Sequence, residues 1–255
     1  MWRSKLTEQQ MEKMQGIALR TRFIDDFVMN GIQFGIRQIV IVGVGMDCRG
    51  IKILDLHLIL ALRLNLPNDC QVYEIDLEEV LTFKNSILEE AMQDNHLTSI
   101  LPLSNRHCIG VDLSTPNSPW KTPLLQSGFD ITQPSLWIME GLLMYLSEED
   151  ITTLVKTVGE LCAPKSRLVA QHGGAPPTQA NASTVHKIHQ DINAPIRSCY
   201  IFDDMKILLS SQKFENTLKI TPFEMGDWAV KRLEEAKIDR KDAEGGYYLF
   251  TTEKM

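Results

Sequence analysis

The chain has 255 residues, of which 44% are hydrophobic and 23% are charged, and its formal net charge is −7. This acidic balance argues against a nucleic-acid partner, which would require a basic face. The five cysteines include no Cys-x-x-Cys pair, which argues against a structural zinc site and favours reduced thiols. The sequence shows neither a signal-peptide pattern nor an apolar run near the ~20 residues of a membrane span. We therefore expect one cytoplasmic domain over residues 1–255, without a membrane partner or a metal.

The first two predicted elements are a helix and a buried strand. Apolar residues recur at helical spacing over residues 5–30. A run of β-branched residues, Ile39 to Val42, then leads directly into Gly43-Val44-Gly45, which is typical of a buried parallel strand and a tight turn. In open α/β sheets a cofactor binds at the carboxyl end of the first strand. We therefore expect residues 38–49 to hold a nucleotide-like cofactor.

Strands and helices are expected to alternate through the rest of the chain. The expected strands are 71–76, 107–112, 136–139, 166–171, 218–221 and 247–252. The expected helices are 51–64, 77–93, one that Ser147 caps and that runs to about 162, 203–211 and 228–236. The expected loops are 94–105 and 113–123, both of which contain proline. This order predicts right-handed crossovers and a mostly parallel sheet, to which the last strand adds as an antiparallel hairpin.

Acidic residues stand where the expected strands end. Asp47 follows the glycine turn, Glu74 and Asp76 close the second strand, Asp112 closes the third and Glu140 follows the fourth. Because the carboxyl ends of parallel strands share one edge, we expect these side chains to lie together where ligands bind. A carboxylate can accept hydrogen bonds from two ribose hydroxyls or from an adenine amino group. Although each acid alone also fits a helix cap, together they favour an adenosine-containing cofactor.

The glycine turn favours S-adenosylmethionine over other nucleotides. It lacks the third glycine of the Gly-x-Gly-x-x-Gly pattern of dinucleotide sites, and the chain has no P-loop for a nucleoside triphosphate. S-adenosylmethionine has no phosphate to bind. Its sulfonium and amino group suit nearby acids, and its carboxylate suits an arginine.

Several motifs resemble the leucine carboxyl methyltransferase family, which includes bacterial polyketide-type O-methyltransferases. The resemblance covers about residues 20–170, and its motifs are Arg20-Thr21-Arg22-Phe23-Ile24-Asp25-Asp26, the stretch Arg37 to Arg49, Tyr73-Glu74-Ile75-Asp76 and Glu140-Gly141-Leu142-Leu143-Met144-Tyr145-Leu146. The resemblance implies an α/β, class I methyltransferase (Rossmann-like) fold. Such a fold has a mostly parallel seven-stranded sheet with an antiparallel last strand and helices on both faces.

The resemblance also implies roles for single residues. The implied cofactor-binding residues are Arg22, with Arg20 as the alternative, for the carboxylate; Gly43 and Gly45, with Asp47, at the methionine end; Asp76 at the ribose; Asp112 and Leu113 at the adenine; and Glu140 at the amino group or the reacting centre. The catalytic candidates are Glu140 and Tyr145, although methyl transfer depends mainly on alignment and a base is optional. His172 is a further candidate base, for which we favour the interpretation of an ordinary loop histidine.

Three features depart from the family pattern, and all fall where an acceptor would be recognised. The arginine motif begins at residue 20, so we expect residues 1–35 to form a reduced helical lid or the substrate to differ. A Leu-rich helix at 53–64 lengthens the interval before the second strand. Residues 172–200 form a candidate substrate-facing insertion.

The sequence thus predicts an S-adenosylmethionine-dependent O-methyltransferase that acts on a carboxyl or hydroxyl group of a small molecule or peptide. One alternative is a catalytically degenerate methyltransferase-fold binding protein. A less favoured alternative is a nicotinamide-dependent oxidoreductase on a similar sheet.

Overall fold

The computed structural model describes residues 8–49, 51–53, 64, 66–93, 100–102, 105–115, 119–173, 197–198, 202–221, 224–235 and 247–255. The main sheet contains β1 (Gln38–Val42), β3 (Gln71–Asp76), β5 (Arg106–Gly110), β6 (Ser135–Met139), β7 (Arg167–Gly173), β8 (Phe214–Ile220) and β9 (Tyr247–Lys254). The helices are α1 (Glu8–Gln33), α2 (Glu78–Gln93), α3 (Lys121–Gln126), the 3-10 helix η3 (Leu143–Tyr145), α4 (Glu148–Leu161), α6 (Phe202–Ser211) and α7 (Asp227–Glu235). Within the described part of the chain, no helix has both the length and the hydropathy to cross a membrane.

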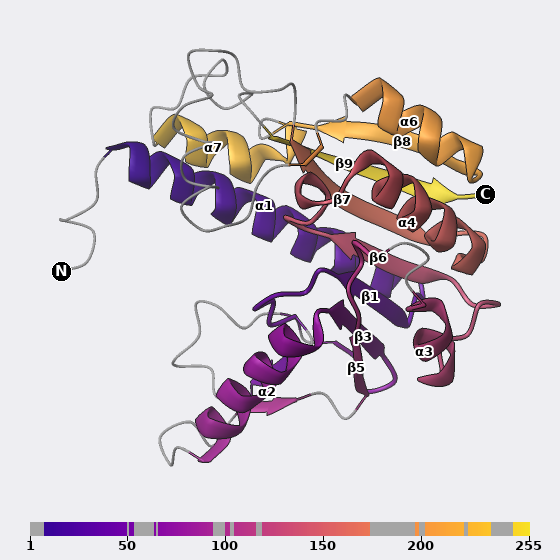
Figure 1. Ribbon diagram of the computed structural model, residues 1–255. Helices are drawn as coiled ribbons and strands as arrows, with labels where there is room; N and C mark the ends of the chain where they lie inside the picture. The colour runs from indigo at the N-terminus through magenta and orange to yellow at the C-terminus, as the bar shows by residue number, and fades with distance from the viewer. Residues whose placement is uncertain are drawn as a thin grey trace.

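The strands of the main sheet run in the order β5-β3-β1-β6-β7-β9-β8 (Figure 1). The first five are parallel to one another, and β9 is antiparallel to both of its neighbours. This confirms the prediction of a mostly parallel seven-stranded sheet with an antiparallel last strand. All five residues of β1 are buried between β3 and β6. Burial on every side explains why its sequence is a continuous apolar run.

Each face of the sheet is covered by different helices. On one face, α1 packs through Ile24, Val28 and Ile32, which follow one another at intervals of four along the helix, and α2 adds Leu81. The opposite face is covered by α3, α4 and α6, and Trp137 lies in that core. Because side chains alternate along a strand, successive residues at a strand end face α1 or α4 in turn. This alternation separates the candidate site residues described below.

The helix after β6 begins where the sequence predicts. The hydroxyl of Ser147 accepts a hydrogen bond from the amide of Asp150 at 3.1 Å, and the carboxylate of Asp150 accepts one from the amide of Ser147 at 3.2 Å. This reciprocal pair is a capping box, which satisfies two backbone donors at the start of α4. The segment between β6 and α4 is therefore short and fixed at both ends.

A short second sheet corrects two predictions. The pattern of residues 51–64 predicts a helix, but Ile51–Ile53 form the strand β2. It pairs antiparallel with β4 (Ile100–Pro102), within a stretch predicted as a loop. Local periodicity does not report a pairing between segments so far apart. The rest of the predicted helix and most of the predicted insertion at 172–200 lie outside the described residues.

Candidate active site

The glycine turn after β1 is held by hydrogen bonds to β3. The amide of Gly43 donates to the carbonyl of Ile75 at 2.8 Å, and the amide of Gly45 donates to Oδ2 of Asp76 at 2.7 Å. The φ angles of Gly43 and Gly45 are +69° and +47°, a region that favours glycine. A Cβ on Gly43 would also lie 2.9 Å from Cδ1 of Leu142. The turn therefore places two residues that have no side chain at the carboxyl edge of the sheet.

Asp76 and Asp112 occupy neighbouring strand ends. The amide of Val111 donates to the carbonyl of Asp76 at 2.7 Å, which joins the end of β3 to the segment after β5. The carboxylate of Asp112 accepts hydrogen bonds from the amide and the hydroxyl of Ser114, at 2.8 and 2.7 Å, and these bonds lower its pKa. Leu113 is partly buried against the core on the α4 side. The two acids thus lie at one edge, with an apolar side chain beside the second.

Glu140 immediately follows β6, and two arginine side chains meet on its carboxylate. Nε of Arg20, from α1, donates to Oε1 at 2.6 Å, and Nη1 of Arg49 donates to Oε2 at 2.8 Å. Arg20 also donates from Nη1 to Oε1 of Gln171 in β7, at 2.8 Å. Burial raises the pKa of Glu140, but the two guanidinium groups outweigh burial and lower that pKa below its usual value. Glu140 is therefore ionised at neutral pH, and it connects α1 and the glycine turn to the centre of the sheet.

Arg49 is a site residue to which the sequence analysis assigned no role. Its side chain is 2% exposed and forms ion pairs with Asp25 of α1, at 2.8 Å, with Asp47 and with Glu140. Burial lowers the pKa of Arg49, but the three carboxylates outweigh burial and raise it above its usual value. Its buried Nη2 has no hydrogen-bond partner among the described residues. The three carboxylates come from separate segments of the chain. The local sequence therefore indicated a role for Arg49 only through its position directly after the Gly-x-Gly-x-Asp-x motif.

The two arginines of the α1 motif have different surroundings. The side chain of Arg22 is 62% exposed, pairs with Asp26 at 2.9 Å and lies over the ring of Trp228 in α7, 5.5 Å from its centroid. The side chain of Arg20 is 26% exposed and reaches Glu140. The sequence analysis favoured Arg22 as the ligand of a carboxylate, with Arg20 as the alternative. The structure brings Arg20, and not Arg22, to the carboxyl edge.

Tyr145 and His172 complete the predicted candidates. Tyr145 lies in η3 and is half-buried, and burial raises its pKa. His172 is fully buried within β7, so its interpretation as a loop histidine is wrong. Its ring stacks on Tyr248 with centroids 6.1 Å apart, and Nε2 lies 3.4 Å from Oγ of Ser198. Because Tyr248 belongs to the core on the α4 side, His172 and Glu140 lie on opposite faces of the sheet.

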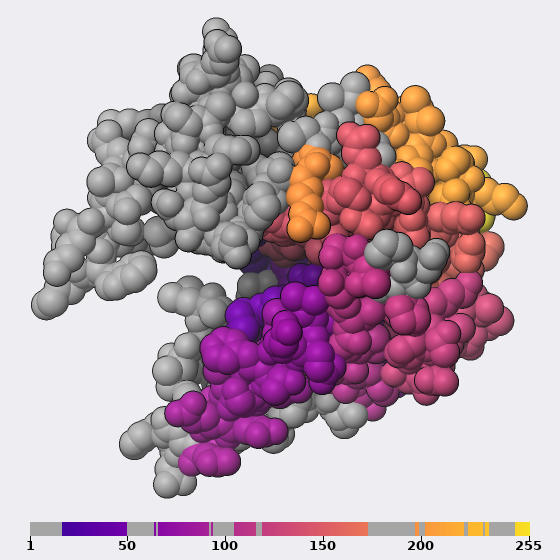
Figure 2. Space-filling model, viewed as in Figure 1, coloured from indigo at the N-terminus to yellow at the C-terminus, as the bar shows by residue number. Residues whose placement is uncertain are grey.

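These groups make an acidic site that also contains three cations. The charged side chains around the glycine turn are the carboxylates of Asp25, Asp47, Asp76 and Glu140, the guanidinium groups of Arg20 and Arg49, and the ammonium group of Lys84. In the space-filling view, indigo atoms of the N-terminal part of the chain are recessed between purple α2 and the red-to-orange part that follows β6 (Figure 2). The excess of carboxylates favours a ligand with net positive charge, while an arginine suits a carboxylate on that ligand.

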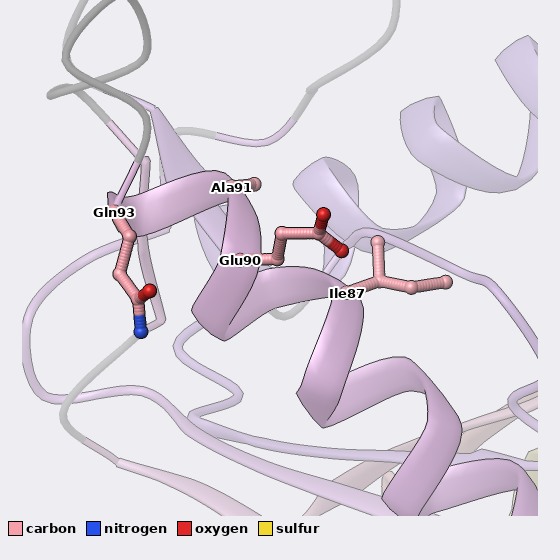
Figure 3. A pocket seen from close by; sticks show the side chains of 4 residues that line it. All are labelled: Ile87, Glu90, Ala91 and Gln93. Carbon is pink, nitrogen blue, oxygen red and sulfur yellow. The ribbon is translucent and has the colours of Figure 1, made fainter.

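A separate depression lies on the exposed side of α2. It is lined by Ile87, Glu90, Ala91 and Gln93. Figure 3 shows Ile87 and Glu90 on one side of the helix and Gln93 on the other. Among the described residues that line it, Glu90 alone is ionisable, so they offer no pair of ionisable groups that could bind and react. The carboxyl edge of the sheet is therefore the candidate active site.

Solved structures share this fold at low sequence identity. A DUF574 family protein from Streptomyces avermitilis matches 93% of this chain and 83% of its own, with a TM-score of 0.64 and 15% identity. A Thermobifida fusca protein named a "putative methyltransferase" matches 95% of this chain and 82% of its own, with a TM-score of 0.59 and 16% identity. The fold is that of class I methyltransferases, as predicted from the sequence.

Sequence relatives cover a shorter part of the chain. Proteins of Mycobacterium ulcerans and Streptomyces coelicolor, both named "Putative S-adenosyl-L-methionine-dependent methyltransferase", are 39% and 38% identical over 61% and 59% of this chain. The matches cover 45% and 43% of those two proteins, so the chain spans about half the length of the relatives it matches. The family model described as leucine carboxyl methyltransferase matches residues 2–159. The chain therefore belongs to the leucine carboxyl methyltransferase family.

Proposed function

We propose that this chain binds S-adenosylmethionine and transfers its methyl group to an oxygen atom, in a carboxyl or hydroxyl group of a small molecule or peptide. The observation that carries the proposal is the pairing of Arg20 with Glu140 beside a glycine turn that Asp76 holds. The amino-acid end of the cofactor is a zwitterion, for which a guanidinium and a carboxylate side by side are complementary. Membership of the family supports the same proposal.

The residues around the glycine turn fit the methionine end of the cofactor. We assign the cofactor carboxylate to Arg20 instead of Arg22, because Arg20 lies at the carboxyl edge and Arg22 is paired on the surface. Gly43 and Gly45 line this end, where the absence of a Cβ lets a ligand approach the backbone closely. Asp47 adds negative charge near the position of a sulfonium.

The neighbouring strand ends fit the nucleoside part. Each carboxylate oxygen of Asp76 accepts one backbone hydrogen bond, from Gly45 and from Leu77, and keeps a second lone pair for a ribose hydroxyl. The segment after β5 is hydrogen-bonded to the end of β3. We therefore assign the adenine to Asp112, as an acceptor for its amino group, and to Leu113, as an apolar contact.

When bound, S-adenosylmethionine supplies an electrophilic methyl group for an in-line displacement. The chain contributes alignment of the two reactants. Glu140 is held ionised by Arg20 and Arg49, so we assign it to orienting the cofactor amino group rather than to donating a proton. Tyr145 stays protonated because burial raises its pKa, which leaves its hydroxyl able to donate a hydrogen bond to the acceptor. A carboxylate acceptor needs no base, whereas a hydroxyl acceptor does.

Two segments are our candidates for acceptor recognition. They are residues 1–35, as a helical lid, and residues 172–200, as a substrate-facing insertion. Of the second segment the structure describes 172–173 and 197–198, and the amide of Arg197 donates to the carbonyl of Met144 at 2.8 Å, beside Tyr145. The cysteines in the described residues are free thiols, which supports a cytoplasmic location.

Calorimetric titration with S-adenosylhomocysteine and with NADH tests the proposal. We expect binding of S-adenosylhomocysteine and no heat with NADH. No heat with S-adenosylhomocysteine well above micromolar concentration would contradict the proposal, and heat with NADH alone would favour the oxidoreductase alternative. Release of S-adenosylhomocysteine from S-adenosylmethionine, in the presence of carboxyl and hydroxyl acceptors, distinguishes an enzyme from a degenerate binding protein.

A further inference from the structure

We propose that Lys84 is a positioning residue whose buried ammonium group fixes the glycine turn through the carbonyl of Asp47. Nζ of Lys84, on α2, donates to that carbonyl at 2.5 Å and to Oε2 of Glu74, in β3, at 2.8 Å. The side chains of Lys84 and Glu74 are 1% and 0% exposed. The link between this contact and cofactor binding rests on the proposed function, whereas the contact itself does not.

The charges in this cluster indicate that Lys84 does more than neutralise Glu74. Nη2 of Arg106, in β5, donates to Oε2 of Glu74 at 2.7 Å and already supplies the opposite charge. The cluster therefore holds two cations and one carboxylate. An uncompensated buried charge is costly, so an apolar side chain in place of Lys84 would relieve the excess. The additional partner of the ammonium group is the carbonyl of Asp47, to which it makes a strong, directional hydrogen bond.

The position of Asp47 controls the rest of the turn. Its amide donates to the carbonyl of Val44 at 2.9 Å, which closes the turn, and its carboxylate pairs with Arg49. Arg49 in turn donates to Glu140 at 2.8 Å. A continuous series of contacts thus runs from Lys84, through Asp47 and Arg49, to the carboxylate that faces Arg20. Loss of the Lys84 contact is expected to loosen both the turn and the arginine that orients Glu140.

Lys84→Met tests this role, because methionine keeps the length of the side chain and removes the donor, while Glu74 retains Arg106. The matched control is Lys121→Met, which removes an exposed lysine on α3 that pairs with Glu160 at 2.7 Å. Amide hydrogen exchange is measured without any cofactor. We expect the amides of residues 43–49 to exchange at least tenfold faster in Lys84→Met, while amides of β6 and α4 keep their rates. The control is expected to change neither set.

The second readout is the affinity for S-adenosylhomocysteine, measured by calorimetry on folded protein. We expect Lys84→Met to weaken it at least tenfold, or about 1.4 kcal/mol, and Lys84→Arg, which keeps a buried donor, to recover most of the loss. Lys84→Gln, which is shorter and uncharged, is measured beside them, so the outcome is decided even where the methionine variant does not fold.

The two readouts separate failure of this inference from failure of the proposed function. A uniform rise of exchange across all amides, with unchanged affinity, would show that Lys84 only stabilises the fold and would overturn the inference. Absence of binding to the unsubstituted protein would instead overturn the proposed function. In that case hydrogen exchange of residues 43–49 still decides whether Lys84 positions the turn.

Discussion

The carboxylate of Asp76 accepts a hydrogen bond from the backbone amide of Gly45 at 2.7 Å, so one side chain links the end of β3 to the turn after β1. Its other oxygen accepts a hydrogen bond from the amide of Leu77 at 2.8 Å. Asp76 therefore organises the backbone of the site and is also our candidate ribose ligand. Substitutions at this position should affect the turn and the ligand together.

Asp76→Ala is expected to weaken binding of S-adenosylhomocysteine at least tenfold, or about 1.4 kcal/mol, in calorimetric titration. The substitution removes both the ribose acceptor and the anchor of Gly45. Asp130→Ala is the matched control, because Asp130 is an exposed aspartate that accepts hydrogen bonds from the amide and hydroxyl of Thr132 away from the site. An affinity that Asp76→Ala leaves unchanged would show that the ribose contact is misplaced.

Arg20 and Arg22 offer a matched pair on one helix. We expect Arg20→Met to reduce the affinity for S-adenosylhomocysteine by tenfold or more, because a charge-assisted hydrogen bond to the ligand carboxylate is lost. We expect Arg22→Met to change it by less than twofold, since Arg22 pairs with Asp26 on the surface. The same titration checks both variants. A larger loss of affinity in Arg22→Met than in Arg20→Met would show that Arg22 binds the carboxylate of the ligand.

The stability contributed by Glu140 should depend on pH. Its pKa is lowered in the folded protein, because the attraction of Arg49 and Arg20 outweighs burial, which alone would raise it. A lowered folded-state pKa stabilises the protein above the ordinary carboxyl pKa, and this stabilisation is lost as the pH falls through the folded-state pKa. We expect Glu140→Gln to reduce the free energy of unfolding by about 1–3 kcal/mol at pH 7.

Urea unfolding of both proteins between pH 7 and pH 3 checks this prediction. The difference in unfolding free energy between them should shrink as the pH falls below the ordinary carboxyl range. Glu89→Gln, at an exposed position of α2, serves as the control and should give a small difference at every pH. If the difference in unfolding free energy between Glu140→Gln and the unsubstituted protein stays constant down to pH 3, the lowered pKa of Glu140 is contradicted.

Gly43 and Gly45 should respond differently to alanine. Both have positive φ, which costs an alanine roughly 1–2 kcal/mol in the left-handed region. At Gly45 a Cβ meets nothing within 4 Å, whereas at Gly43 it would lie 2.9 Å from Cδ1 of Leu142. Gly43→Ala should therefore lower the free energy of unfolding more than Gly45→Ala, as measured by urea titration. Equal losses would show that Leu142 moves aside freely.

Much of the edge of the sheet could be predicted from local patterns. The run Ile39 to Val42 identified the central strand, because complete burial demands continuous apolar sequence. Asp76 closes β3, and Asp112 and Glu140 come after β5 and β6, so the common edge of these acids could be inferred from parallel topology. Each of these inferences depended only on recognising a single strand and the direction in which it runs.

The helical spacing of α1 distinguishes Arg20 from Arg22, although the prediction favoured Arg22 as the carboxylate ligand. Arg20 precedes Ile24, Val28 and Ile32 at successive intervals of four, which places it on the stripe of α1 that packs on the sheet. Arg22 lies two positions away from that stripe and therefore points outward. Because α1 also carries apolar residues outside this stripe, its packed face was difficult to identify from the sequence.

The ion pairs of Arg49 and the strand Ile51–Ile53 had no comparable signal. Arg49 is paired with Asp25 and Glu140, which come from α1 and from the residue after β6. Ile51–Ile53 pairs with Ile100–Pro102, and its composition continues smoothly into a Leu-rich run. Both features arise from contacts between distant segments, which tertiary structure creates and local propensity does not encode.

The last strand in sequence, β9, lies inside the sheet between β7 and β8. Among the described strands, β8 pairs only with β9, so it has no partner until residues 247–254 have been added to the chain. Lys254 donates to the carbonyls of Gly159 and Gln212, at 2.9 and 2.5 Å, which binds β9 to α4 and to the turn after α6. Pairing of β8 with the sheet therefore depends on residues 247–254, and assembly of this side of the sheet has to wait for them. Removal of residues 247–254 would leave β8 without its partner among the described strands, although the glycine turn lies far from them in the sequence.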